Sequence, residues 1–355
     1  MGDNSKIEWT EATWNCLYGC SRVSPGCENC YAERHCHRFS GPSQRHEGLT
    51  VLRKHGPVWT GKIDLAYHRL FEPMKWTRGR RIFVNSLSDV FHADVPFTYV
   101  MAMYGVMAAC PHHTFQLLTK RHWRMADFYA LTRAMDRPMK ACVDEAKLML
   151  DKVFAENRIS VGLYTRYRVR LDIASDAPWP PPNIWLGVSA EDQQRADERL
   201  DALFKCEAAV RWASVEPLLG PVDLDRKGRL SGAYESAVPP DLRSCRLGSV
   251  ERVQVQVLDW VVVGGESGPG ARSMDVRWAM DVIDQCEAHG VPLLMKQLGS
   301  EPTQPDPAYE GPVADAPRVK LPLSHDKGGD WDEWDPRLRV RKYPKVVDAA
   351  QAVSA

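Results

Sequence analysis

The sequence predicts a mixed α/β fold in which parallel strands alternate with helices, and three observations support this prediction. Short runs rich in Val, Ile, Leu and aromatic residues recur along the chain, and polar residues follow each run. Helical patterns separate several of these runs. The chain of 355 residues, 44% of them hydrophobic, can bury a substantial core. Strands separated by helices pair in parallel, so the leading architecture is a full or partial TIM-like (β/α) barrel.

The expected strands follow one another between residues 7 and 299. The first, IEWTEATWN (7–15), precedes a group of cysteines. The others are RRIFVNSLSD (80–89), HTFQLLTKR (113–121), NIWLGVSAED (183–192), VRWASVEP (210–217), DWVVVGGESG (259–268) and VPLLMKQLG (291–299). Helices are expected at 99–110, 193–209 and 276–290, the last ending at Gly290, where a helix stop is favoured.

One barrel-like domain is expected over residues 1–300, with insertions at 134–180 and 223–254. The second insertion is polar and rich in turn residues. The first ends in the stiff segment APWPPPN and contains an amphipathic helix with one apolar face: Val143, Ala146, Leu150, Val153 and Phe154. Residues 301–355 are rich in Pro and Asp and end in AAQAVSA, so we expect a partly flexible C-terminal extension.

Charge and hydropathy restrict the class of protein. Lys plus Arg number 46 and Asp plus Glu number 46, so no overall positive field marks the chain as a nucleic-acid binder. The N-terminus, MGDNSKIEWTE, lacks the apolar core of a signal peptide, and no run of about 18 apolar residues is present. We therefore expect a cytoplasmic protein that does not cross a membrane.

Half of the ten cysteines lie in the segment WNCLYGCSRVSPGCENCYAERHC, residues 14–36. A chain of this size in a reducing compartment does not need a disulfide framework, so these thiols point to metal binding. The remaining cysteines are scattered, several of them in apolar helical settings, and are expected to be small core residues: Cys110, Cys142, Cys206, Cys245 and Cys286.

Three interpretations compete for Cys16, Cys20, Cys27 and Cys30: a structural zinc site, an iron-sulfur cluster, and buried thiols that bind no metal. A structural zinc site would use four thiolates, but only six residues separate C-x3-C from C-x2-C, fewer than zinc sites usually have. The short gap favours one loop wrapped around an iron-sulfur cluster. Cys20, Cys27 and Cys30 would leave one iron open, whereas Cys16 as a fourth ligand would close the site. Further candidate ligands are His35, Cys36 and His37.

Polar side chains follow nearly every expected strand, at the edge where ligands bind in parallel α/β folds. Each one alone is explained equally well as a helix cap, a turn residue or a solvated corner. Together they indicate an enzyme, and the candidate catalytic residues among them are Asp89, Lys120, Glu191, Glu216 and Lys296.

The loop GGESGPGAR (264–272) follows a run of three valines. Its glycines would let backbone amides approach an anion or a ribose, although it lacks the lysine of a Walker motif. The candidate cofactor-binding residues are Gly264, Gly265, Glu266 and Ser267.

Several segments in order resemble the phage-associated three-Cys-motif family, which is largely uncharacterised. They are W-N-x3-G-C-x6-C-x2-C-Y-A-E, FVNSLSDVFHADVP, LLTKR, NIWLGVSAEDQ, SVEPLLGP, DWVVVGGESGPGARSMD, LLMKQLG and KGGDWDEWDPRLRVRKYP. That family is distantly similar to radical S-adenosylmethionine (SAM) enzymes. The resemblance implies a 4Fe-4S cluster on Cys20, Cys27 and Cys30, SAM as the second cofactor and an external electron donor.

Two departures accompany the resemblance. The usual radical SAM loop is C-x3-C-x2-C, whereas this chain has C-x6-C-x2-C, and Cys16 stands where the family is expected to have proline. The leading hypothesis is a radical SAM-like enzyme that cleaves SAM and acts on an unknown substrate. The stretches TKRHWR, YTRYRVR and RLRVRKYPK suggest a nucleic acid. The alternative is a non-enzymatic zinc or iron-sulfur protein that binds nucleic acid or a partner protein. A SAM-dependent methyltransferase would leave the cysteines without a role.

Overall fold

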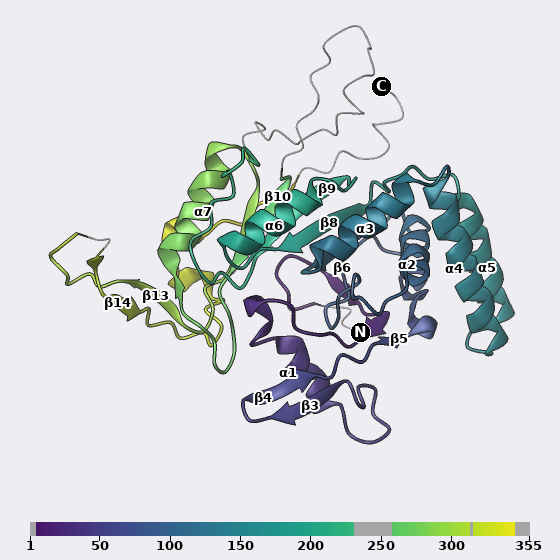
Figure 1. Cartoon of the computed structure of the whole chain (residues 1–355), viewed down its shortest axis with the longest axis horizontal. Coiled ribbons are helices and arrows are strands. Elements are labelled where there is room, and N and C mark those ends of the chain that lie inside the picture. Colours follow the sequence, from purple (N-terminus) through teal and green to yellow (C-terminus); the bar gives the residue numbers. More distant parts are fainter. Residues whose placement is uncertain (1–4, 231–257, 313–314, 345–355) are drawn as a thin grey trace, which may run out of the picture. The chain divides into compact units, whose positions relative to one another are not determined.

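The computed structural model describes residues 5–230, 258–312 and 315–344 and forms two compact units (Figure 1). Unit 1 contains the described residues up to Ser189 together with Glu198–Val210. Unit 2 contains Ala190–Asp197 and the described residues from Arg211 onward. The units are described separately below, and the single domain expected over residues 1–300 stays a prediction.

Unit 1 is built on four parallel strands in the order β1-β6-β7-β8. They are β1 (Ala12–Trp14), β6 (Arg81–Val84), β7 (Thr114–Thr119) and β8 (Ile184–Ser189). Every residue of β8 is buried, as expected of a parallel strand that is covered on both faces. The carboxyl ends of these strands place the residues after 14, 84, 119 and 189 along one edge of the sheet.

The helices of this part of the chain are, in order, α1 (Tyr31–Arg38), α2 (Phe97–Ala108), α3 (His122–Arg133), α4 (Pro138–Ala155) and α5 (Val161–Ala174). The helices α4 and α5 form the first insertion and lie side by side (Figure 1). The expected apolar face of α4 is buried except for Phe154, which is half-buried and stacks on Tyr164 of α5. The stretch YTRYRVR (164–170) lies within α5.

Two small antiparallel sheets complete the N-terminal part of unit 1. The strands β3 (Thr50–Arg53) and β4 (Gly56–Trp59) form a hairpin that packs on α1 (Figure 1). The strand β2 (Leu17–Tyr18) pairs with β5 (Asp64–Leu65). Sequence patterns did not predict either pair, because their strands are short and partly exposed.

Unit 2 has a three-stranded parallel sheet in the order β9-β10-β12. Its strands are β9 (Val210–Val215), β10 (Trp260–Gly264) and β12 (Leu293–Gln297). The helix α7 (Val276–Ala288) begins at the N-cap Asp275, whose carboxylate accepts a hydrogen bond from the amide of Arg277. A second sheet contains β11 (Met274–Asp275), β13 (Pro302–Pro305) and β14 (Arg318–Lys320).

The predicted α/β class and the parallel pairing within each unit are confirmed, since all seven expected strands are present. The helix expected over 193–209 is shorter, because α6 (Gln193–Leu203) ends where the chain turns toward β9. Most of the second insertion, Cys245 and the tail AAQAVSA lie outside the described residues. Within the part of the chain that the structure describes, no helix has both the length and the apolar character needed to span a bilayer.

Candidate functional site

Cys20, Cys27 and Cys30 lie on one loop of unit 1, between β2 and α1. The loop starts after Gly19, where φ is +89° and an added Cβ would lie 2.0 Å from a backbone carbonyl oxygen, so only glycine fits. The 3-10 helix Pro25–Cys27 turns the chain, and Cys30 is the N-cap of α1. The loop thus follows the first strand of the parallel sheet, as the sequence predicted.

The three thiols are close enough for their charges to interact. Burial raises the pKa of Cys20 to about 12, and negative charge on Cys30 and Cys27 acts in the same direction. Burial also raises the pKa of Cys30, where Cys27 again adds to the effect. Without a metal or a cation nearby, such a group of half-buried thiols would therefore stay protonated.

Three cations surround these thiols. The Arg121 guanidinium favours the thiolate form of Cys20, and the Lys120 ammonium favours that of Cys30. The backbone amides of Ala32 and Glu33, at the start of α1, also favour the Cys30 thiolate. Arg22 is the third cation, and its pKa is raised chiefly by Glu33 and further by Cys30 and Cys27. These groups oppose the effect of burial on the thiol pKa values only in part, since both pKa values remain raised.

A bidentate ion pair fixes the long segment between Cys20 and Cys27. Arg22 donates from Nε and Nη2 to the two carboxylate oxygens of Glu33, at 2.9 and 2.6 Å. Glu33 is 1% exposed, and its Oε1 also accepts a hydrogen bond from the amide of Trp59 in β4. The sequence motif contains both residues, but their spacing of 11 positions across a loop and a helix gave no indication of this pair.

Asp89 anchors the loop instead of standing free for a ligand. Its Oδ1 accepts hydrogen bonds from the Phe91 amide (3.0 Å) and the Thr119 hydroxyl (2.7 Å). Its Oδ2 accepts from the Lys120 amide (3.1 Å) and from Arg121 Nη1 (2.9 Å). Both oxygens are therefore occupied by groups of the protein, and a catalytic role of Asp89 stays a prediction.

Lys120 lies at the same edge of the sheet. Its ammonium donates to the Ser189 hydroxyl at the end of β8 (3.2 Å) and acts on the Cys30 thiol. A lysine in this position can hold a negatively charged group of a ligand, so the predicted site residue Lys120 is placed beside the thiols.

Cys16 lies in the core with a different set of neighbours. It is fully buried, its thiol lies 3.8 Å from Oδ1 of Asn85, and its carbonyl oxygen accepts a hydrogen bond from Tyr99. Burial raises the pKa of Cys16 to about 12, and the groups that act on it are Tyr99, Asn85 and Glu72 rather than the loop thiols. This placement favours a core role over that of a fourth ligand.

Cys36, in contrast to Cys16, is influenced by the charge of one of the loop thiols. It is fully buried on α1, and its pKa is raised to about 12 by burial and by the charge of Cys30. His35 contacts the rings of Phe39 and His46, and His37 Nδ1 lies 3.2 Å from a threonine hydroxyl. Among the described residues, no three His, Cys, Asp or Glu side chains are grouped closely enough to ligate one metal ion.

In unit 2, two predicted residues form an ion pair at the strand ends. Lys296 Nζ donates to Oε1 of Glu216 at 2.5 Å, and both side chains are 18% exposed. A Cβ added to Gly264 would lie 3.3 Å from Cδ of Glu216, so this glycine leaves room for the carboxylate. The structure thus brings Glu216, Gly264 and Lys296 together at neighbouring strand ends, and their roles in binding or catalysis stay predictions.

The glycine loop of unit 2 is tied to its own unit. A Cβ on Gly265 would lie 2.1 Å from the carbonyl oxygen of Leu298, so close backbone packing accounts for this glycine. Glu266 is 7% exposed and pairs with Arg272 at 2.6 Å. Ser267 is half-buried, and Glu191 is fully buried. Cofactor binding by this loop stays a prediction.

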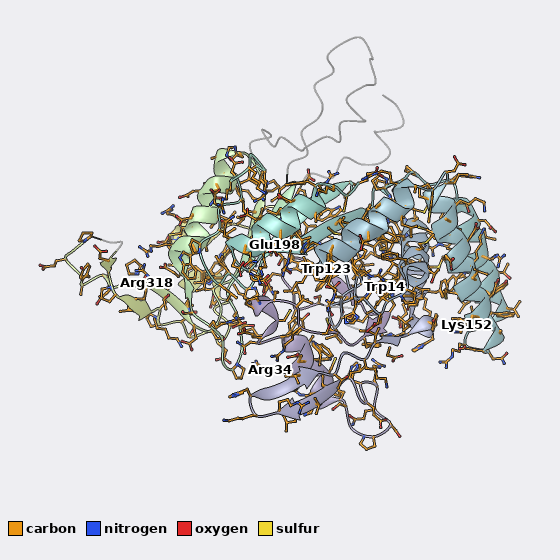
Figure 2. The ribbon with its side chains drawn as sticks, viewed as in Figure 1. Trp14, Arg34, Trp123, Lys152, Glu198 and Arg318 are labelled. Carbon is orange, nitrogen blue, oxygen red and sulfur yellow. The ribbon has the colours of Figure 1, made fainter. Side chains whose placement is uncertain are left out.

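The basic stretches make many contacts within the chain. In YTRYRVR, Arg168 binds Asp151, and Arg170 donates to the carbonyl oxygen of Ala109. In RLRVRKYPK, Arg337 binds Asp284. Trp123 of TKRHWR is 48% exposed at the start of α3, and Figure 2 labels it together with Arg34 of α1.

The fold and the site define a parallel α/β protein with a three-thiol loop at the carboxyl end of its sheet. The chain belongs to the family described as "Protein of unknown function (DUF5131)", whose model matches residues 4–336. No curated protein and no solved structure matches it. Membership of the phage-associated three-Cys-motif proteins stays a prediction.

Proposed function

We propose that this protein is an iron-sulfur enzyme of the radical SAM type, with a partial TIM-like barrel as its fold. In this proposal Cys20, Cys27 and Cys30 hold a four-iron cluster. The observation that supports the proposal is that these three thiols lie on one loop after the first strand of a parallel sheet, near enough to interact electrostatically with one another and with Arg22, Lys120 and Arg121. A cluster bound by three thiolates with one iron open can deliver single electrons to SAM at that iron.

The chain's own groups supply what such a cluster needs. Thiolates must lose their protons to bind iron, and Arg22, Lys120 and Arg121 offset the negative charge that results. The Arg22–Glu33 pair holds the loop in place before a metal binds. Lys120 would hold an anionic group of the ligand, while Asp89 positions Arg121.

Unit 2 carries polar groups of its own. Glu216 and Lys296 are partly exposed and would bind or polarise a ligand of that unit. Glu191 and Glu266 are buried and would support the loops rather than touch a ligand. A nucleic-acid substrate remains part of the proposal, and the exposed Trp123 is one aromatic residue available for base stacking.

Anaerobic purification followed by iron, sulfide and zinc analysis tests the cluster, and addition of SAM with a strong reductant tests the chemistry. We expect about four irons per chain and reductant-dependent 5′-deoxyadenosine. Replacing Cys20, Cys27 or Cys30 by Ala should abolish the cluster. The matched control is Cys286→Ala, which removes a buried thiol of unit 2. Stoichiometric zinc without iron would refute the cluster, and a cluster without SAM cleavage would refute the enzymatic part.

A closed site is the second candidate function, because Cys36 interacts with Cys30. A fourth thiolate from Cys36 would leave no iron open and would make the protein an electron carrier or a structural iron-sulfur or zinc protein. In that case Cys36→Ala should lose the metal along with the three loop variants. Full retention of the cluster in Cys36→Ala would favour the open site.

A further inference from the structure

One buried arginine connects the cysteine loop to the sheet. Arg121 is 3% exposed and directly follows the end of β7. Its Nη1 donates to the sulfur of Cys20 (3.5 Å) and to Oδ2 of Asp89 (2.9 Å). Its Nη2 donates to the carbonyl oxygen (2.8 Å) and the hydroxyl oxygen (3.0 Å) of Ser21. A single planar guanidinium thus contacts a candidate metal ligand and the residue after it.

The position of Arg121 is itself tightly determined. Its backbone amide donates to the Thr119 hydroxyl (2.9 Å), and that hydroxyl donates to Asp89 (2.7 Å). An arginine side chain stays protonated in proteins. The guanidinium is therefore a permanent charge, held by these hydrogen bonds in a fixed direction toward the sulfur.

Ser21 and His92 extend this support and do not form a nucleophilic pair. The Asp94 amide donates to Nδ1 of His92 (3.2 Å), so Nε2 carries the proton and donates to the Ser21 hydroxyl oxygen (2.8 Å). A histidine that donates to a serine cannot act as its base. Ser21 thus receives hydrogen bonds from both Arg121 and His92, which stabilises the start of the loop.

We propose that Arg121 is a positioning residue of the cluster site, which fixes the sulfur of Cys20 and raises the reduction potential of the bound cluster. This inference rests on the proposed function. Hydrogen bonds to ligand sulfurs and nearby positive charge both stabilise the more negative, reduced state of a cluster. Cys20 is the thiol to which Arg121 donates directly, so the three ligands of the cluster are not equivalent.

Arg121→Met and Arg121→Lys test the inference, with Arg124→Met as the matched control. Arg121 is the N-cap residue of α3, and Arg124 lies in the first turn of that helix. Arg124 donates to the Val95 carbonyl oxygen and stacks on Phe97, and neither of these contacts involves a thiol. The double variant Asp89→Asn/Arg121→Met covers the case in which the single variant fails to fold because it leaves a buried carboxylate unpaired.

The readouts are iron retention and the midpoint potential from a redox titration followed by electron paramagnetic resonance. Outer-shell partners typically change metal affinity about 10–100-fold, so we expect at least about tenfold faster iron loss from Arg121→Met and from the double variant. We also expect a lower potential in Arg121→Met, a smaller decrease in the double variant because loss of the Asp89 charge opposes it, an intermediate effect in Arg121→Lys, and wild-type values in Arg124→Met.

Two results would overturn the inference while leaving the proposed function intact. One is a wild-type potential and wild-type iron retention in Arg121→Met or in the double variant. The other is an equal change in Arg124→Met, which would reveal a general effect of lost charge. Absence of an iron-sulfur cluster from the wild-type protein would instead refute the proposed function and the inference together.

Discussion

His113 should make the folded protein sensitive to mild acid. The ring is 1% exposed and lies against Trp76 and Phe115, at centroid distances of 5.9 Å each. Its Nε2 donates to the carbonyl oxygen of Pro73 (3.2 Å), whereas the buried Nδ1 has no hydrogen-bond partner. A proton added at Nδ1 would therefore place an uncompensated charge in the core.

The direction and size of the effect follow from the pKa of His113. Burial, chiefly, and the neighbouring His112 lower this pKa from 6.5 to about 4. Above pH 6.5 the ring is neutral in the folded and the unfolded chain, so it has no effect on stability. Between pH 6.5 and 4 the unfolded chain takes up the proton first, and the folded state loses up to about 3 kcal/mol before the loss levels off.

Urea denaturation at several pH values between 4 and 8 measures this loss. The comparison variant is His113→Gln, because a Gln side chain can keep the hydrogen bond to Pro73 and does not titrate. The free energy of unfolding of the wild type should fall more steeply with acid than that of the variant, by about 3 kcal/mol at pH 4. Parallel curves for the two proteins would refute the reasoning.

Other predictions concern packing and the identity of the thiols. Gly265→Ala should destabilise unit 2 by about 2 kcal/mol or more in urea denaturation, because the new Cβ would overlap the Leu298 carbonyl oxygen. Gly162→Ala, where nothing lies within 4 Å, should be neutral or stabilise by about 0.5 kcal/mol, and equal effects at the two sites would contradict the packing argument. Cys16→Ala should keep all of its iron but unfold at lower urea, since its thiol fills the core. Loss of iron from Cys16→Ala and not from Cys36→Ala would show that Cys16, and not Cys36, is the fourth ligand.

Much of the fold could be predicted from the sequence because buried parallel strands form continuous apolar runs. Residues 260–263 and 184–188 are clear cases, and both are strands in the structure. The short hairpin β3-β4 could not be predicted, because its half-exposed residues show neither strong alternation nor a tight-turn motif. The end of α6 was also misplaced, since helix ends depend on where the chain must turn next.

The candidate site was predicted in outline and not in its pairings. The sequence placed Lys120, Glu216 and Lys296 at the carboxyl ends of strands, and the structure has them there. Strand-end positions could not show that Asp89 binds Arg121. An aspartate at the end of a strand looks the same in the sequence whether its partner is a ligand or an arginine. The bond from Arg121 to Cys20 joins residues 101 positions apart. No local pattern encodes such a contact.

The sequence by itself determined the α/β class, the succession of strands along the chain and the crowding of cysteines after the first strand. Each of these depends on composition and spacing along the chain. Only the tertiary structure decided which groups surround each thiol. Cys16 and Cys20 are four residues apart, yet the glycine turn between them sends Cys16 into the core and Cys20 toward Arg121. Distance in space, and not separation in sequence, sets the charges that a thiol experiences.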